Sequence, residues 1–436
     1  MIIRVEDFGK IKSATVNLDG YTIFVGDNNS GKTYLMQLIY GTLEALKRIQ
    51  FTDSMSNLPN VKATQVKTIV NKWLQEKKDT IVHNTFKKKI PINLIEILFP
   101  ESEDIFSVKK LTKEEYCNLT GENVPFLRET NENFQIFSIF VNDSIKSSFF
   151  GFDASKGFMY SEMIRFAVGR LLKIKNIRHS NNIFLPASRS GLMLTRPFVF
   201  ANKNEEGFVS TEEFSSEKRK ENELGLTQPV YDFLSFLQTH KSSENETNKS
   251  SALISFINEN IIHGEMKKTD NESFYKPEGT EEWLSPSVTS SMVNEISPIL
   301  QILTSVRRFQ YIFYDEIETC QHPTTQIQMA RLLNRMVNAG YKMVVSTHSD
   351  TMAAAINNAI SIEKLKNSNE ILKKLGYEKK DILVNNDLVH AYQFIKSESG
   401  TIVEEVKRHP AIGLNFNFTL FNEANKKLFD AYKYLR

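Results

Sequence analysis

One short stretch near the start of the chain, Gly26 to Thr33, constrains the fold more than any other part of the sequence. Its letters, GDNNSGKT, give a glycine, four further residues, a second glycine, a lysine and a threonine in that order. Glycines at both ends let the backbone turn tightly enough to aim several N–H groups at one point. A concave run of donors that ends in a lysine suits a phosphate group.

The stretch lies between a predicted strand and a predicted helix. Tyr21 to Val25 are β-branched or aromatic and predict a buried strand, and apolar residues recur at helical spacing from Leu35 to Leu46. The helix N-terminus adds a dipole that favours anions. The sequence therefore predicts a phosphate-binding loop, in which Lys32 reaches the β- and γ-phosphates and the Thr33 hydroxyl binds Mg²⁺. The loop residues expected to bind the nucleotide are Gly26, Asn28, Asn29, Ser30, Gly31, Lys32 and Thr33.

A second apolar segment ends in two acids. In FQYIFYDEIETCQHP, Tyr311 to Tyr314 are apolar or aromatic, and Asp315 and Glu316 follow. Taken alone, two acids after such a run are more often a strand end that meets solvent. Together with the loop they predict that Asp315 binds Mg²⁺ beside Thr33, and that Glu316 polarises a water for attack on the γ-phosphate.

A third apolar segment, in YKMVVSTHSD, ends at His348. A histidine just past a buried strand is expected either to contact the γ-phosphate as a catalytic sensor or to be an ordinary surface histidine. Its place after the acidic strand favours the sensor. The three segments together predict ATP and Mg²⁺ as cofactors and hydrolysis of ATP as the reaction.

Composition limits the alternatives. The chain has 436 residues, with 54 Lys and Arg against 52 Asp and Glu, so any contact with DNA must come from a local basic patch. The two cysteines are too few for a disulfide framework, which fits a reducing compartment. No secretory signal and no apolar run of about 18 residues is evident, so the protein is expected to be cytoplasmic and without a membrane anchor.

Four segments, in order along the chain, resemble the ABC-type ATPase head of the branch that includes SMC proteins, RecF-like proteins and OLD-family ATPases. They are GDNNSGKT, LSPSVTSSMVNEI, IFYDEIETCQHP and VVSTHSD. The resemblance implies an α/β P-loop NTPase fold with a mainly parallel core sheet, an N-terminal antiparallel sheet and helical insertions. The head is expected to comprise residues 1–45, 126–200 and 261–436, with mainly helical insertions at 46–125 and 201–260. Within the head, EMKKTDNESFYKPEG predicts a hairpin, and the polar tract Thr239–Ser251, in the second insertion, predicts a loop.

The segment SPSVTSSMVNEI departs from the Leu-Ser-Gly-Gly core of transporter signatures. In the OLD-like branch a Ser-Ser pair that opens a helix occupies this place, so the resemblance assigns Ser290 and Ser291 to nucleotide binding. The same hydroxyls would also suit ordinary helix capping. In this family the signature of one subunit closes on the nucleotide of the other. The resemblance therefore implies a homodimer or higher oligomer with ATP sandwiched between the heads.

Two uses of ATP remain open. The signature disfavours a transporter, no long heptad array supports a coiled-coil arm, and no Asp-x-Asp metal site of the Toprim type follows Asp350. The first expectation is a nucleotide-dependent sensor that regulates a separate nuclease or toxin in bacterial anti-phage defence, with no nuclease activity of its own. The alternative is a RecF- or SMC-like DNA-binding ATPase in DNA repair or maintenance. The segment FLPASRSGL, from Phe184 to Leu192 with Arg189 as its charged centre, also resembles a strand-and-loop element common in these proteins.

Overall fold

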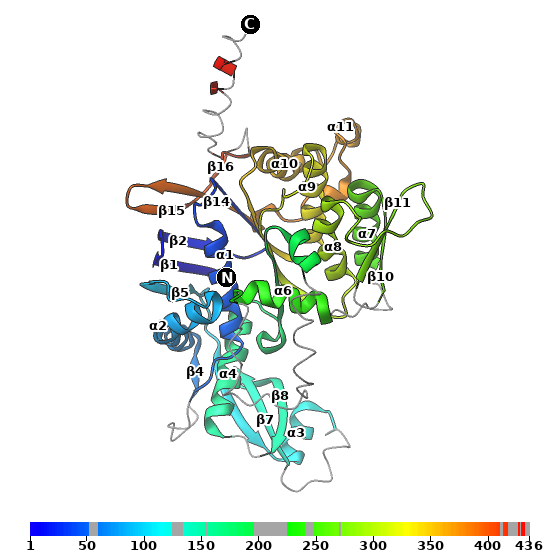
Figure 1. Cartoon of the computed structure of the whole chain (residues 1–436). Coiled ribbons are helices and arrows are strands. Elements are labelled where there is room, and N and C mark those ends of the chain that lie inside the picture. The colour runs from blue at the N-terminus through cyan, green and yellow to red at the C-terminus, as the bar shows by residue number, and fades with distance from the viewer. Residues whose placement is uncertain are drawn as a thin grey trace. The chain divides into compact units, whose positions relative to one another are not determined.

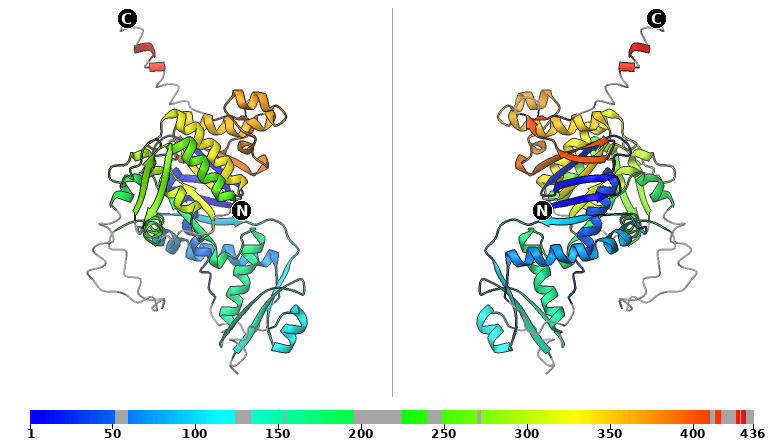
Figure 2. Two further views of the ribbon diagram at one scale, coloured as in Figure 1. Left: turned by 90° about the vertical axis from the view of Figure 1, so that its right-hand side faces the viewer. Right: turned by 90° about the vertical axis from the view of Figure 1, so that its left-hand side faces the viewer.

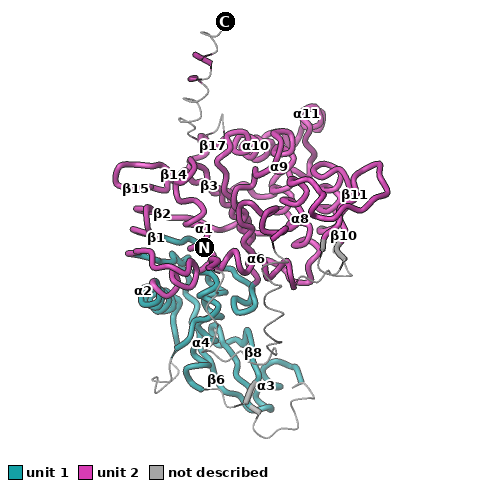
Figure 3. Tube along the Cα trace, in the orientation of Figure 1, with its two compact units in different colours: residues 1–4, 42–78, 94–180 teal, residues 5–41, 79–93, 181–436 magenta. Residues whose placement is uncertain are grey.

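The computed structural model divides the chain into two compact units (Figure 3). Unit 1 comprises residues 1–4, 42–78 and 94–180, and unit 2 comprises residues 5–41, 79–93 and 181–436. The described residues are 1–51, 60–123, 134–152, 155–195, 225–239, 248–269, 272–409, 413–416, 426–427 and 429–431. The candidate site residues predicted from the sequence all belong to unit 2.

A nine-stranded sheet forms the centre of the fold (Figure 1). Its strands, in order, are β5 (Leu94–Leu98), β1 (Ile2–Phe8), β2 (Ile11–Asn17), β15 (Gly400–Glu405), β14 (Val389–Ser397), β3 (Tyr21–Gly26), β13 (Lys342–Thr347), β12 (Phe309–Tyr314) and β9 (Asn181–Leu185). The run β9, β12, β13, β3, β14 is parallel throughout, and β15 is antiparallel to β14. The carboxyl ends of β12, β13 and β3 therefore meet at one edge of the sheet.

Helices cover both faces of this sheet. On one face, Tyr40 of α1 (Lys32–Leu46) contacts the ring of Phe313 edge to face, with centroids 5.8 Å apart. The neighbouring residues Ile312 and Tyr314 belong instead to the apolar core on the other face, because successive side chains of a strand alternate. That core also includes residues of α8 (Ser291–Leu303), α9 (Pro323–Asn338) and α10 (Asp350–Ser361).

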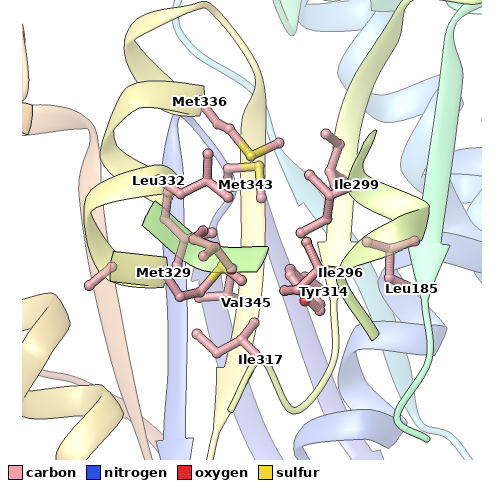
Figure 4. Close-up of a cluster of buried hydrophobic side chains, with 14 of the residues drawn as sticks. Leu185, Ile296, Ile299, Tyr314, Ile317, Met329, Leu332, Met336, Met343 and Val345 are labelled. Atoms are coloured by element: carbon pink, nitrogen blue, oxygen red, sulfur yellow. The ribbon is translucent and has the colours of Figure 1, made fainter. Parts of the chain in front are cut away.

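The core beneath α8 and α9 is closely packed (Figure 4). Figure 4 labels ten of its side chains, namely Leu185, Ile296, Ile299, Tyr314, Ile317, Met329, Leu332, Met336, Met343 and Val345. Burying one such side chain is worth about 1.5–3 kcal/mol. Side chains of α8, α9, β12 and β13 thus share one apolar core. The polar residues Asp315, Glu316 and His348 directly follow β12 and β13 in the chain.

Most of the remaining described elements of unit 2 contribute side chains to this core. Gln301 of α8 donates a hydrogen bond to Ser273 of the hairpin strand β11 over 3.2 Å, and Figure 2 shows the hairpin beside these helices. The elements are α6 (Gln228–Thr239), α7 (Asn248–Ile257), the π-helical turn η3 (Asn258–Ile262), β10 (Gly264–Thr269), β11 (Glu272–Pro277), η4 (Ile362–Leu365), α11 (Asn369–Lys374), η5 (Lys379–Asp381), η6 (Asn386–Leu388), β16 (Arg408–His409) and β17 (Gly413–Leu414). The predicted hairpin is confirmed by the antiparallel pairing of β10 with β11. Of the tract predicted as a loop, residues 240–247 lie outside the described residues.

Unit 1 contains a separate antiparallel sheet. Its strands, in order, are β4 (Val61–Lys62), β6 (Ile105–Leu111), β7 (Phe134–Val141) and β8 (Ser144–Phe152). Each neighbouring pair is antiparallel. Unit 1 also includes β5 and parts of β1 and α1. Its other described elements, wholly or in part, are α2 (Ala63–Phe86), α3 (Lys113–Thr120), α4 (Lys156–Leu171) and η2 (Ile177–His179).

The expected fold class is confirmed: the chain is an α/β protein with a mainly parallel core sheet and a separate antiparallel sheet. One detail differs, because the antiparallel sheet is not built from the N-terminal strands. Instead β1, β2 and β3 join the large sheet, where β2 and β3 find parallel partners in β15, β13 and β14. Those partners lie hundreds of residues away, so the local pattern could not show them.

The region 46–125, expected to be mainly helical, holds the strands β4, β5 and β6 as well as α2 and α3. The division into a head and two insertions stays a prediction, and the two compact units have other boundaries. Among the described residues no helix is both long enough and apolar enough to cross a membrane.

Candidate nucleotide-binding site

The loop from Gly26 to Lys32 joins the end of β3 to the start of α1. Its two glycines have φ values of +155° and +104°, which residues with a side chain rarely adopt. A Cβ added at Gly26 would lie 2.9 Å from both Cβ and the carbonyl oxygen of Phe394 on β14. The backbone of the predicted phosphate loop therefore requires glycine at both positions, as the sequence pattern indicated.

Lys32 lies over the inside of this loop. Its Nζ donates hydrogen bonds to the carbonyl oxygens of Gly26 (2.7 Å) and Asp27 (2.9 Å), and the residue is 7% exposed. Burial lowers the pKa of the Lys32 ammonium, and the nearby carboxylates of Asp315 and Glu318 oppose that effect. The ammonium is thus a desolvated positive charge that would gain strongly from an anion beside it.

Ser30 provides the clearest sign of a missing partner in the loop. Its hydroxyl oxygen is buried and has no hydrogen-bond partner among the residues that the structure describes. Buried hydroxyls are ordinarily paired, because an unpaired one loses its hydration without compensation. A phosphate oxygen in the loop would accept from this hydroxyl, so the residues present fit the β- and γ-phosphates of a nucleotide.

Asn28 and Asn29 are exposed at the tip of the loop. Their carbonyl oxygens accept hydrogen bonds from two lysines: Lys396 Nζ of β14 binds Asn28 O at 2.7 Å, and Lys10 Nζ, from the turn between β1 and β2, binds Asn29 O. Burial, and then the charge of Lys396, lowers the pKa of Lys10. Sequence reasoning missed both lysines, because the strands that flank them reach the loop only through the pairing of the large sheet.

Thr33 and Asp315 meet although 282 positions separate them in the sequence. Thr33 Oγ1 donates to Asp315 Oδ2 over 2.8 Å, and the other carboxylate oxygen accepts from the Ser346 hydroxyl. Asp315 is 1% exposed, and burial raises the pKa of its carboxyl, while the hydrogen bonds from Ser346 and Thr33 oppose the rise. A buried carboxylate beside a hydroxyl offers the oxygen ligands that Mg²⁺ prefers.

The described residues contain no group of three or more His, Cys, Asp or Glu that could hold a metal by themselves. Mg²⁺ commonly keeps several waters and binds through one or two protein groups together with substrate phosphates. Thr33 and Asp315 fit that mode of binding, which depends on the nucleotide.

Glu316 has an unusual backbone conformation, with a φ of +47°. Its N–H donates to Ser346 Oγ (2.9 Å), and its carbonyl oxygen accepts from Arg189 Nη2 (3.1 Å). Its side chain is 35% exposed, so water can reach the carboxylate. Burial, and then the charge of Asp315, raises the pKa of Glu316. A carboxylate with a raised pKa is a better proton acceptor than an ordinary one.

His348 lies beside two carboxylates at the end of β13. Its ring Nδ1 is 4.0 Å from Glu316 Oε1 and 3.0 Å from Glu318 Oε1. The backbone N–H of His348 donates a hydrogen bond to Glu318 Oε1 over 2.8 Å. The structure therefore brings His348, Glu316, Asp315 and the phosphate loop together. Glu318, whose place two residues after Glu316 was the signal in the sequence, orients the histidine.

Ser290 and Ser291 lie at the start of α8 and both are exposed. The Ser290 hydroxyl accepts a hydrogen bond from Val293 N over 3.4 Å. Within the chain, Ser290 therefore acts as the N-cap of α8. No hydrogen bond found in the described part of the chain joins either serine to the phosphate loop or to Asp315. Their assignment to nucleotide binding stays a prediction.

Comparison with known proteins gives structural likenesses only. No family model matches the chain, and no curated protein matches it by sequence. Among solved structures it is similar to an Smc head bound to the C-terminal winged-helix domain of ScpA (10% identity, 94% of this chain and 98% of that chain, TM-score 0.36). It is also similar to an Smc head domain with an extended coiled coil bound to the C-terminal domain of ScpA, derived from Pyrococcus furiosus (10%, 99% and 98%, 0.35). A third is the SMC head domain from Thermotoga maritima (10%, 93% and 98%, 0.34).

Proposed function

We propose that the chain is an ABC-type ATPase that binds ATP with Mg²⁺ and hydrolyses it to ADP and phosphate. The observation that carries the proposal is the 2.8 Å hydrogen bond from Thr33 to Asp315. This bond places the phosphate loop directly beside the end of the acidic strand. Two motifs with unrelated roles would have no reason to be in contact. Backbone N–H groups of the loop, the Ser30 hydroxyl and Lys32 would bind the β- and γ-phosphates.

Glu316 and His348 would act on the γ-phosphate side of this site. Glu316 would orient a water and accept its proton while the water oxygen forms a bond to the γ-phosphorus and the bond to the bridging oxygen of ADP breaks. Mg²⁺, held beside Thr33 and Asp315, would neutralise negative charge on the phosphates. His348, held by Glu318, would donate a hydrogen bond to the γ-phosphate.

The hydrolysis assignment is tested by measuring phosphate release from ATP with purified protein. We expect Mg²⁺-dependent release by the wild type and a loss of about 100-fold or more in Glu316→Gln, since general-base catalysis contributes about 10²–10⁴-fold. The variant should keep its ATP affinity, because Glu316 does not bind the phosphates. A Glu316→Gln protein that hydrolyses ATP at the wild-type rate would show that the base is another residue.

We further propose that two heads pair through ATP, with Ser290 and Ser291 of one protomer on the nucleotide of the other, and that the pair regulates a separate nuclease or toxin in anti-phage defence. The exposed start of α8 supports the pairing. The sequence resemblance to OLD-like ATPases supports the regulatory role.

The regulatory role is tested by a tagged pull-down from the native host with the neighbouring genes intact, followed by native mass spectrometry with and without ATP. A nuclease or toxin bound in a fixed ratio is the expected result. A dimer that carries DNA and no second polypeptide would instead establish the DNA-maintenance alternative.

A further inference from the structure

Arg189 is fully buried and binds the backbone of the acidic pair. The residue is 0% exposed, and its Nη1 donates to the carbonyl oxygen of Asp315 over 2.6 Å. Nη2 donates to the carbonyl oxygen of Glu316 over 3.1 Å, and Nη1 also reaches Pro186 O at 2.8 Å. The guanidinium lies 4.5 Å from the ring centroid of Tyr314. One side chain thus contacts three consecutive residues of the acidic strand end.

Glu295 of α8 holds this arginine in place. Its Oε2 lies 2.7 Å from Arg189 Nε, and its Oε1 accepts a hydrogen bond from Ser190 N over 2.9 Å. The Nε–Oε2 contact is close without being aligned as a hydrogen bond, so it acts as an ion pair. Both residues are 0% exposed. A fully buried ion pair adds little net stability, because desolvation offsets the attraction. Its specific geometry therefore needs another explanation.

The conformation of Glu316 supplies that explanation. A glutamate with a φ of +47° is in the left-handed region, where a side chain is unfavourable. Such a conformation persists only when the surroundings fix it from several sides. Its N–H is fixed by Ser346 and its carbonyl oxygen by Arg189, so the direction of the carboxylate depends on both contacts.

We propose that Arg189 is a positioning residue for ATP hydrolysis, held by Glu295, which sets the backbone of Asp315 and Glu316 so that the Glu316 carboxylate faces the attacking water. This inference rests on the proposed function, because it assumes that Glu316 activates the water. It assigns a role in hydrolysis to a residue that would touch neither the nucleotide nor the attacking water. It also links α8, which starts at the predicted signature serines, to the hydrolytic centre of the same protomer.

The test is the double variant Arg189→Met/Glu295→Met. It removes both charges together and keeps unbranched side chains, so the fold should survive, as buried ion pairs often tolerate apolar replacement. We expect kcat to fall about 10- to 100-fold, since a small misplacement of a catalytic group can have an effect of that size. The Kd for ATP, measured by isothermal titration calorimetry in Mg²⁺, should stay within about twofold, because the phosphate loop is untouched.

Two further variants separate positioning from general stability. Glu295→Gln keeps an acceptor for Ser190 N and removes only the charge, so it should lower kcat without unfolding the protein. Asp381→Asn is the matched control, since it weakens another buried ion pair of unit 2, with Arg331 at 2.7 Å. It should lower Tm and leave kcat unchanged.

Wild-type kcat in a folded double variant would overturn the inference. If the double variant does not fold, an unchanged kcat in Glu295→Gln would overturn it instead. Failure of the proposed function is a distinct outcome, because it appears as undiminished hydrolysis in Glu316→Gln, whatever the Arg189 variants do.

Discussion

Asp315 shows at the residue scale how function and stability oppose each other in this site. The carboxyl is almost completely buried, and burial raises its pKa above the ordinary value. In the folded protein its ionised form is therefore disfavoured relative to the unfolded chain. The hydroxyls of Thr33 and Ser346 reduce the penalty without removing it. In the proposed function, the Mg²⁺ that the carboxylate binds would offset this cost of burial.

Replacing Asp315 by Asn should therefore stabilise the protein and abolish Mg²⁺-dependent hydrolysis. Since the pKa of Asp315 is raised on folding, its contribution favours folding below the unfolded pKa and is lost as the pH rises through the folded pKa. Near neutral pH we expect Asp315→Asn to raise the free energy of unfolding by about 1 kcal/mol, a few degrees in Tm.

The measurement for Asp315→Asn is thermal unfolding between pH 4 and pH 8 without nucleotide. The difference in Tm from the wild type should grow as the pH rises. Asp387→Asn, which removes an exposed carboxylate, is the control and should show no such trend. A variant that loses stability at neutral pH would contradict the argument.

Lys32 is the residue on which the proposed binding of ATP would depend most directly. Its Nζ lies over the loop carbonyls, and the site offers it a phosphate partner. Lys32→Ala should weaken ATP binding by about 10- to 150-fold, because a hydrogen bond to a charged group is worth about 1.5–3 kcal/mol. Calorimetry measures this loss, and circular dichroism checks that the fold is kept. Lys366→Ala, at an exposed position, is the control and should bind ATP like the wild type. If Lys32→Ala also bound ATP as tightly as the wild type, the assignment of the loop to phosphate binding would be wrong.

At the element scale, α8 combines a buried body with an exposed start. Its residues from Val293 to Leu303 are all buried, whereas Ser290 and Ser291 are exposed. The helix is thus fixed by packing, and its first hydroxyls and N–H groups face solvent, where a second protomer could bring a phosphate. The capping bond at Ser290 is long, at 3.4 Å, so it contributes little to holding the helix.

Ser290→Ala should accordingly have a small effect on stability and a large effect on pairing. We expect a loss of at most about 1 kcal/mol in the free energy of unfolding, the usual value for an N-cap. ATP-dependent dimers, measured by light scattering, should decrease strongly. Ser155→Ala removes the N-cap of α4, whose hydroxyl accepts from Phe158 N at 3.2 Å, and should leave pairing unchanged. Normal pairing by Ser290→Ala would remove the serine from the interface.

At the scale of the whole molecule, the proposed switch is a change in oligomeric state. ATP would join two protomers, because its γ-phosphate would contact the phosphate loop of one protomer and the start of α8 of the other. Hydrolysis would remove that phosphate and release the protomers. The wild type would then be dimeric only while ATP lasts.

Glu316→Gln should therefore accumulate as a dimer in ATP and Mg²⁺, since it binds without hydrolysing. Native mass spectrometry should show twice the monomer mass with two bound nucleotides. ADP in place of ATP, or removal of Mg²⁺ by a chelator, should return it to the monomer. A mass independent of nucleotide would contradict the switch.

Local patterns in the sequence were sufficient for much of the site. The spacing of Gly26, Gly31, Lys32 and Thr33 predicted the loop between β3 and α1, and apolar runs predicted β12 and β13, which end just before Asp315 and His348. These features depend on neighbours in the chain, because backbone torsion and strand alternation are local properties.

What the sequence determined by itself is the set of parts: a phosphate loop between a strand and a helix, an acidic strand end and a histidine strand end. Only the tertiary structure decided which parts meet. It placed Lys10 and Lys396 on the loop, Glu318 against His348, and Arg189 with Glu295 behind the acidic pair. The physical reason is that strand pairing and the burial of ion pairs join residues remote in the chain, and no local pattern records such partners.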